Sequence, residues 1–161
     1  MRKSASDHKD ALLADLAAAR ENLLAVIREL PPHCLDEPCI GFWTVKDLIA
    51  HLVGWDITNL QAVKEILAEQ RPSFFQHYDP DWQSYNARLV ETYRREPLEA
   101  LISEVGVSHV QLLSFLQSLP ADVVIRGKSP KEQGRPVTIR NLLRAEAADE
   151  RKHCQQVQTF R

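Results

Sequence analysis

The chain has 161 residues and a formal net charge of −2, with 20 lysines and arginines against 22 aspartates and glutamates. Its 44% hydrophobic and 26% charged residues indicate a globular protein, and the length fits a single domain over residues 1–161. Because no excess of positive charge exists to attract phosphates, we expect no nucleic-acid partner. The apolar runs are short and broken by charges, and the N-terminus is polar, so we expect neither a membrane partner nor export. A cytoplasmic location is the default.

Three cysteines are too few and too scattered for a disulfide framework or a multi-cysteine zinc site. Cys34 and Cys39 fall in an expected loop, and Cys154 directly follows His153. Adjacent residues on a helix point about 100° apart, so these last two side chains do not readily share one site. We therefore interpret Cys154 as a small packing residue rather than a nucleophile.

Four segments repeat apolar residues at spacings of three and four, which predicts helices. The first covers residues 6–30 and ends at two consecutive prolines. The second begins at Thr44, a good N-cap with Asp47 three residues later, and runs to about residue 69. The third starts near Asp81, is divided at Pro97 and closes at residue 120, and the last runs from Thr138 to the end.

Two stretches separate these helices, residues 71–80 and residues 123–136. The second is rich in glycine and proline and is the least helical part, with room for a short extended piece. Four amphipathic helices bury their apolar faces only against one another, so the predicted fold is an all-α four-helix bundle. The long connection before the third helix permits a crossover. The residues alone leave this topology and simple up-down-up-down equally open.

Polar residues interrupt the apolar faces of the second and fourth helices. His51 lies one turn from Leu48, while Asp149 and His153 are four residues apart and project to the same side of the last helix. A histidine and a carboxylate one turn apart, joined by a histidine from a facing helix, can hold zinc, nickel, iron or manganese. The alternative is that Asp149 and His153 form an ordinary weak ion pair on a helix surface.

Other polar and aromatic residues are candidates to contact a ligand. His109 interrupts an apolar stripe, where it either lines a pocket, and could add a fourth ligand, or bonds a partner within the core. Trp55, Trp82, Tyr85 and Asn86 could line a small-molecule site at the mouth of the bundle. In the alternative interpretation, Asp79 or Asp81 caps the third helix and Trp82 packs on the core.

Two stretches resemble the DinB-like proteins. Residues 42–55, FWTVKDLIAHLVGW, are similar to the start of that family's second helix, and residues 149–157, DERKHCQQV, resemble its last-helix pattern of two histidines four apart followed by glutamine. The resemblance implies a four-helix bundle with one crossover and a divalent metal held by three histidines. His51 and His153 match two of these positions, whereas Asp149 stands at the third. Aspartate can still ligate, but the departure is also consistent with a lost metal site.

The resemblance also implies two kinds of activity. Some branches of the superfamily are transferases that use a low-molecular-weight thiol, including maleylpyruvate isomerases that use mycothiol. Another branch, to which the Trp43–Trp55 segment is more similar, includes a hydrolase that protects cells from a genotoxic natural product. A homodimer is the assembly that the resemblance implies.

Two hypotheses of different classes follow. In the first, the chain is a metal-dependent hydrolase or thiol-dependent transferase acting on a small electrophilic compound. Glu146 or Glu150 would serve as base, although Glu150 is expected on the outer face. In the second, the bundle is a metal-free module that binds a small molecule without turnover and protects against it. The experiment that separates them is a test for bound metal.

Overall fold

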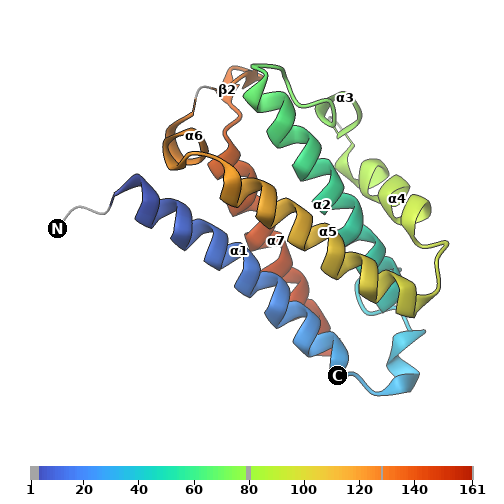
Figure 1. Ribbon diagram of the computed structural model, residues 1–161. Helices are drawn as coiled ribbons and strands as arrows, with labels where there is room; N and C mark the ends of the chain where they lie inside the picture. Colours follow the sequence, from blue (N-terminus) through green and yellow to red (C-terminus); the bar gives the residue numbers. More distant parts are fainter. Residues whose placement is uncertain (1–3, 79–80, 128, 161) are drawn as a thin grey trace.

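The computed structural model describes residues 4–78, 81–127 and 129–160, and its dominant feature is a bundle of four long helices (Figure 1). The all-α four-helix bundle predicted from the apolar spacing is therefore confirmed. The helices have 24, 23, 21 and 22 residues, respectively: α1 (Ala5–Arg28), α2 (Val45–Leu67), α5 (Leu98–Ser118) and α7 (Ile139–Phe160). None of the helices described is long and apolar enough to cross a bilayer.

The topology contains the crossover. Helix α2 runs antiparallel to α1, whereas α5 runs parallel to α2 and alongside it, and α7 runs parallel to α1 (Figure 1). Two neighbouring parallel helices need a return path, which α4 (Trp82–Tyr93) provides by descending along α2. This arrangement replaces the simple up-down-up-down alternative. It also sets α2 antiparallel to α7, so residues early in α2 face residues late in α7.

Side-chain caps define where the helices begin. The hydroxyl of Thr44 accepts a hydrogen bond from the Asp47 amide, and the Asp47 carboxylate accepts one from the Thr44 amide, so the predicted cap of α2 is a full capping box. Ser4 and Asp7 form the same motif on α1. Asp81 caps α4 by accepting from the Ser84 amide. Asp79, the alternative cap, lies outside the described residues.

The connections contain short elements that the apolar pattern did not predict. A 3₁₀ turn, Pro32–Leu35, follows α1, and a one-turn helix, α3 (Phe75–Tyr78), lies within the segment expected to be a plain connection. Helix α6 (Ala121–Arg126) occupies the start of the stretch expected to be least helical. The extended piece expected there is a hairpin of β1 (Lys131–Glu132) and β2 (Arg135–Pro136), whose two turn residues both have positive φ.

The core consists of two apolar halves separated by a polar layer. One half gathers residues from the N-terminal part of α1 and the C-terminal part of α2, and the other gathers the opposite ends of the same helices. Between them lie buried polar side chains from all four long helices: Arg20, Asp56, Asn59, Ser108, His109, Glu146 and Glu150. The apolar halves stabilise the bundle, and the layer between them adjoins the candidate site described below.

Helix α4 approaches α2 closely because Gly54 has no side chain. A Cβ built on Gly54 would lie 2.9 Å from Leu89 Cβ and within 3.2 Å of both its methyl carbons. Real Cβ atoms do not approach this closely, so glycine permits the packing of the crossover helix on the bundle.

We therefore expect Gly54→Ala to destabilise the protein by about 1–3 kcal/mol, because the two helices must separate or Leu89 must leave its rotamer. Gly106→Ala is the matched control: it also lies within a long helix, but its added Cβ meets nothing within 4 Å. There, alanine should stabilise by about 0.5–1 kcal/mol. Urea unfolding of both variants measures the difference. Equal effects would contradict the close-packing explanation.

Candidate metal centre and adjoining cavity

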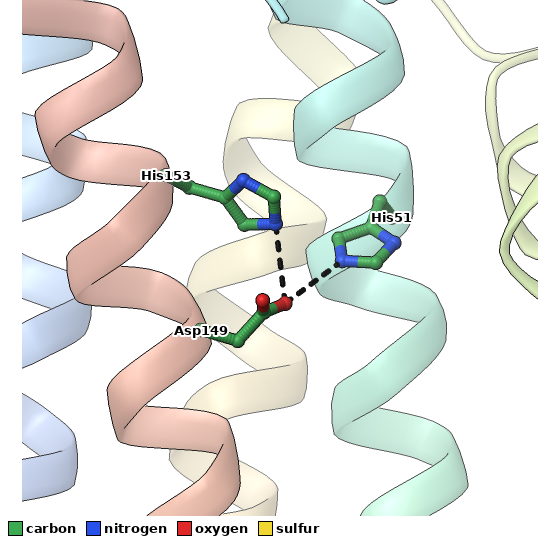
Figure 2. Close-up of side chains that lie close together, drawn as sticks. All are labelled: His51, Asp149 and His153. Atoms are coloured by element: carbon green, nitrogen blue, oxygen red, sulfur yellow. Dashed lines mark ion pairs between the residues drawn. The ribbon is translucent and has the colours of Figure 1, made fainter. Parts of the chain in front are cut away.

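The structure brings His51, Asp149 and His153 together. Asp149 Oδ2 lies 3.6 Å from His51 Nε2 and 3.1 Å from His153 Nε2, and one ligand atom from each of the three residues lies within 4.8 Å of the others. Figure 2 shows the two imidazoles, from α2 and α7, pointing toward the same carboxylate. Both histidines are buried, whereas the Asp149 side chain is 47% exposed. The cluster is therefore shielded from solvent at the two histidines and accessible to solvent at Asp149.

Neighbouring side chains hold the two rings in place. The indole of Trp43, which precedes α2, lies 4.8 Å from the His51 ring between centroids, and the two imidazoles are 5.3 Å apart. His153 Nδ1 lies 2.8 Å from Gln156 Oε1, one turn further along α7. If Nδ1–H donates to this oxygen, the Nε2 lone pair of His153 points toward Asp149.

The ionisation of the cluster suits a cation. Burial lowers the pKa of His51, and the Asp149 carboxylate offsets this only in part, so the ring is neutral at pH 7. Burial would raise the pKa of Asp149, but the adjacent rings of His153 and His51 outweigh it and hold that pKa well below its usual range. A neutral imidazole and an ionised carboxylate are the forms that ligate a metal.

A cavity of about 430 Å³ adjoins the cluster and shares Asp149 with it. Aromatic side chains from α2, α4 and the segment before α4 form much of its wall: Trp55, Phe74, Phe75 and Trp82. Lys152 supplies a cationic group to its lining, and Asn59 and Glu146 supply polar ones. A cavity with apolar walls and a few polar groups is typical of a small-molecule site.

Three of the five residues expected to contact a ligand line this cavity, namely Trp55, Trp82 and Asn86. Asn86 also accepts a hydrogen bond from the Trp55 indole at 2.9 Å, which fixes the ring. Tyr85 does not line the cavity: its hydroxyl lies 2.9 Å from that of Thr58, and its ring packs against Trp55. His109 is turned into the core.

His109 belongs to a buried network centred on Arg20. The guanidinium donates to both Asp56 oxygens at 2.8 and 3.0 Å and to both Glu150 oxygens at 2.8 and 3.1 Å. Ser108 donates to Asp56 at 2.7 Å, and His109 Nδ1 lies 3.4 Å from the same carboxylate. Glu150, expected on the outer face, is instead 1% exposed. Arg20 draws it inward, because a buried guanidinium with five donors needs more than one acceptor.

Glu146 is a buried acid that borders the cavity and forms no ion pair with any of the described residues. Its Oε2 accepts a hydrogen bond from Asn59 Nδ2 at 2.9 Å. Burial and the negative charges of Glu150 and Asp56 raise the pKa of Glu146 to about 8, although Arg20 and Asn59 act in the opposite direction. The side chain is therefore a neutral carboxylic acid at pH 7.

Sequence reasoning missed Arg20, Asp56 and Asn59, although a signal was available. Arg20 continues the apolar stripe of α1, since it lies four residues after Leu16 and three before Leu23. Asp56 and Asn59 continue the stripe of α2 in the same way. A charged or amide side chain in the middle of an apolar stripe indicates a buried hydrogen-bond or ion-pair partner.

The family follows from a match over nearly the whole chain. The model of the DinB superfamily matches residues 8–157. The chain belongs to the DinB superfamily. The predicted resemblance is thereby confirmed. No curated protein matches the chain.

Solved structures share the fold at low sequence identity. An uncharacterised protein from Escherichia coli UTI89 superposes with a TM-score of 0.73 at 15% identity, covering 94% of this chain and 91% of that one. A protein from Streptococcus pneumoniae gives 0.75 at 13% identity, covering 94% and 89%. The colibactin self-resistance protein ClbS, in complex with a dsDNA, gives 0.71 at 16% identity, covering 94% of both chains.

The ClbS complex corrects one expectation. We excluded a nucleic-acid partner because the net charge is −2, but a protein of this fold was crystallised with double-stranded DNA. Net charge averages over the whole surface, whereas contacts to phosphates need only local donors and cations. The exclusion is therefore wrong as an inference from charge. The expected homodimer and cytoplasmic location stay predictions.

The raised pKa of Glu146 predicts a pH-dependent effect of Glu146→Gln. In the unfolded chain the carboxyl ionises above its ordinary pKa of 4.5, whereas in the fold it keeps its proton up to about 8. Between these values the wild type loses stability as pH rises, and the glutamine variant lacks this loss. We expect the variant to gain on the order of 3 kcal/mol relative to wild type between pH 5 and pH 8.

The measurement is urea unfolding at both pH values with a chelator present, so that metal binding does not contribute. Glu21→Gln, at an exposed position of α1, is the control and should change the free energy of unfolding little at either pH. A constant difference between Glu146→Gln and wild type would show that Glu146 is ionised in the fold.

Proposed function

We propose that this chain is a divalent-metal-dependent enzyme that acts on a small electrophilic compound held in the cavity beside His51, Asp149 and His153. The observation that carries the proposal is the position of Asp149, which both belongs to the three-residue cluster and lines the cavity. A bound ion would therefore face a bound ligand. Sites with three protein ligands leave coordination positions for water or substrate.

The residues present fit a divalent ion. The buried Nε2 of His153 lacks a hydrogen bond of normal geometry among the described residues, although it points at a carboxylate. A buried polar atom without such a bond is costly, and coordination would satisfy it. Two imidazoles and one carboxylate suit zinc, nickel, iron or manganese. Aspartate in place of the family's third histidine is compatible with this set.

The metal would act as a Lewis acid and lower the pKa of a water or of a low-molecular-weight thiol. The chain's own residues supply the rest of the site. Trp55 and Trp82 provide apolar surface for the body of the compound, and the hydrogen bond to Asn86 fixes one of these rings. Glu146 holds a proton at the cavity wall and is the candidate general acid.

A second candidate is protection by binding without turnover. The likeness in fold to ClbS, a self-resistance protein, favours it. In this case the aromatic cavity would sequester a reactive compound, and the three-residue cluster would be an ion pair network without metal. The two candidates differ in metal content and in whether the compound is consumed.

The first experiment is elemental analysis of protein purified without a histidine tag. We expect about one zinc, nickel, iron or manganese per chain, lost in His51→Ala because the cluster then keeps only two ligands. His33→Ala is the matched control, since His33 is exposed in the 3₁₀ turn after α1 and should keep the metal. No metal in any sample, even after addition in excess, would overturn the metal-dependent proposal.

Turnover separates the remaining alternatives. The metal-loaded protein should consume activated esters or epoxides, and His51→Ala should reduce the rate by at least about tenfold. Consumption in buffer alone indicates a hydrolase, whereas a requirement for added thiol indicates a transferase. Binding of the same compounds with no consumption, followed by mass spectrometry, would favour the protective candidate.

A further inference from the structure

Glu146 and Asn59 form a polar pair in the cavity wall, which also contains four aromatic side chains. Glu146 projects from α7 and Asn59 from α2, and both line the cavity although each is buried. The Asn59 amide donates to Glu146 Oε2 at 2.9 Å. Within the described part of the chain, Oε1 has no protein hydrogen-bond partner, and it is not fully enclosed either. The second oxygen of the carboxyl group is therefore available to the cavity.

Burial, and then the charges behind the pair, decide which form of the carboxyl group is present. On the core side Glu146 faces the negative charges of Glu150 on its own helix and Asp56 on α2. The single positive charge of Arg20, from α1, is already bonded to both of those acids, and His109 of α5 contacts Asp56. Among the described residues this guanidinium is shared by two carboxylates, and Lys152, which also lines the cavity, is exposed and has no hydrogen bond to Glu146, so Glu146 keeps its proton.

The hydrogen bond from Asn59 then fixes where that proton sits. A neutral carboxyl group has one carbonyl oxygen and one hydroxyl, and the oxygen that accepts from an amide is the carbonyl. Because Oε2 accepts from Asn59, the hydroxyl is Oε1, the oxygen available to the cavity. The pair thus presents an O–H donor to a ligand rather than a negative charge.

We propose that Glu146, oriented by Asn59, is a specificity-determining residue whose hydroxyl donates a hydrogen bond to an uncharged oxygen acceptor, of the carbonyl class, on an aromatic or otherwise apolar ligand. The proposal rests on the proposed function in placing the substrate in this cavity. The aromatic walls select the apolar body, and the hydroxyl selects the acceptor. A ligand carboxylate is disfavoured in the metal-free cavity, because it would be desolvated among aromatic rings and beside Asp149, while Lys152 is exposed to water.

The test compares three probes of one shape. The probes are 2-acetonaphthone, which has a carbonyl acceptor and no donor, 2-ethylnaphthalene, which has neither, and 2-naphthoate, which is charged. Binding near pH 6.5 is measured by calorimetry or by quenching of tryptophan fluorescence, both for the protein as purified and for protein treated with a chelator to remove metal. We expect the ketone to bind about fivefold more tightly than the hydrocarbon, the difference that one net hydrogen bond supplies. In the chelator-treated protein, the carboxylate should bind most weakly.

The variants assign this preference to Glu146. Glu146→Gln keeps a donor, since its amide can accept from Asn59 and donate into the cavity, and should keep the ketone-to-hydrocarbon ratio. Glu146→Leu and Glu146→Ala lack the donor and should reduce the ratio to about one. Because both probes have one shape, a general change in cavity size affects both affinities and leaves their ratio unchanged. The alanine variant replaces the leucine variant if the latter fails to fold. Glu21→Leu, on the exposed side of α1, should leave the ratio unchanged.

Two results would overturn the proposal. One is a wild-type ratio near one, and the other is a ratio that survives in Glu146→Ala. Metal content, measured on the same samples, separates this inference from the proposed function. A ketone preference that depends on Glu146 in protein without metal supports the inference while the metal-dependent activity fails. Bound metal with no ketone preference would overturn the inference and leave the metal-dependent activity standing.

Discussion

The arrangement of the bundle depends on a buried guanidinium. Arg20, 2% exposed, joins α1 to α2 through Asp56 and α1 to α7 through Glu150. Ser108 and His109 attach α5 to the Asp56 carboxylate. Breaking a buried ion pair by removing one partner typically costs about 3–5 kcal/mol, because the other charge stays buried. Apolar packing alone would tolerate a rotation or shift of one helix on another. The network does not, because its donors and acceptors meet in one register.

The position in which this network fixes the helices also affects two acids at the neighbouring cavity, Asp149 and Glu146. Glu150 follows Asp149 directly, so drawing Glu150 to Arg20 directs Asp149, about 100° away around α7, toward His51. Glu146, one turn before Glu150, faces the negative charges of Glu150 and Asp56 and forms no ion pair with any described residue. The polar layer thus orients the candidate ligand set and also keeps one acid protonated at the cavity wall.

The sequence predicts the bundle well and the site in part. Spacing of apolar residues, the Thr44–Asp47 cap and Pro97 locate the long helices, because these signals are local. The grouping of His51 with Asp149 and His153 was also predictable, from a four-residue spacing and a resemblance. Arg20 and Asn59 were not assigned, because spacing within one helix does not reveal a partner on another. The partners of Arg20 lie 36 and 130 residues away, and the partner of Asn59 lies 87 residues away. The one-turn helix α3 was not predicted either, because four residues are too few to show a helical repeat of apolar residues.

The crossover divides the site between two parts of the chain. The three candidate ligands lie on α2 and α7, which the polar layer locks together, whereas Phe74, Phe75, Trp82 and Asn86 belong to the return path between α2 and α5. That path contacts the bundle where Leu89 packs against Gly54 and where the Trp55 indole donates a hydrogen bond to Asn86. Mutations within it can therefore alter the shape of the cavity while leaving the reactive groups in place. Members of a family built in this way can diverge in substrate and keep a common chemistry.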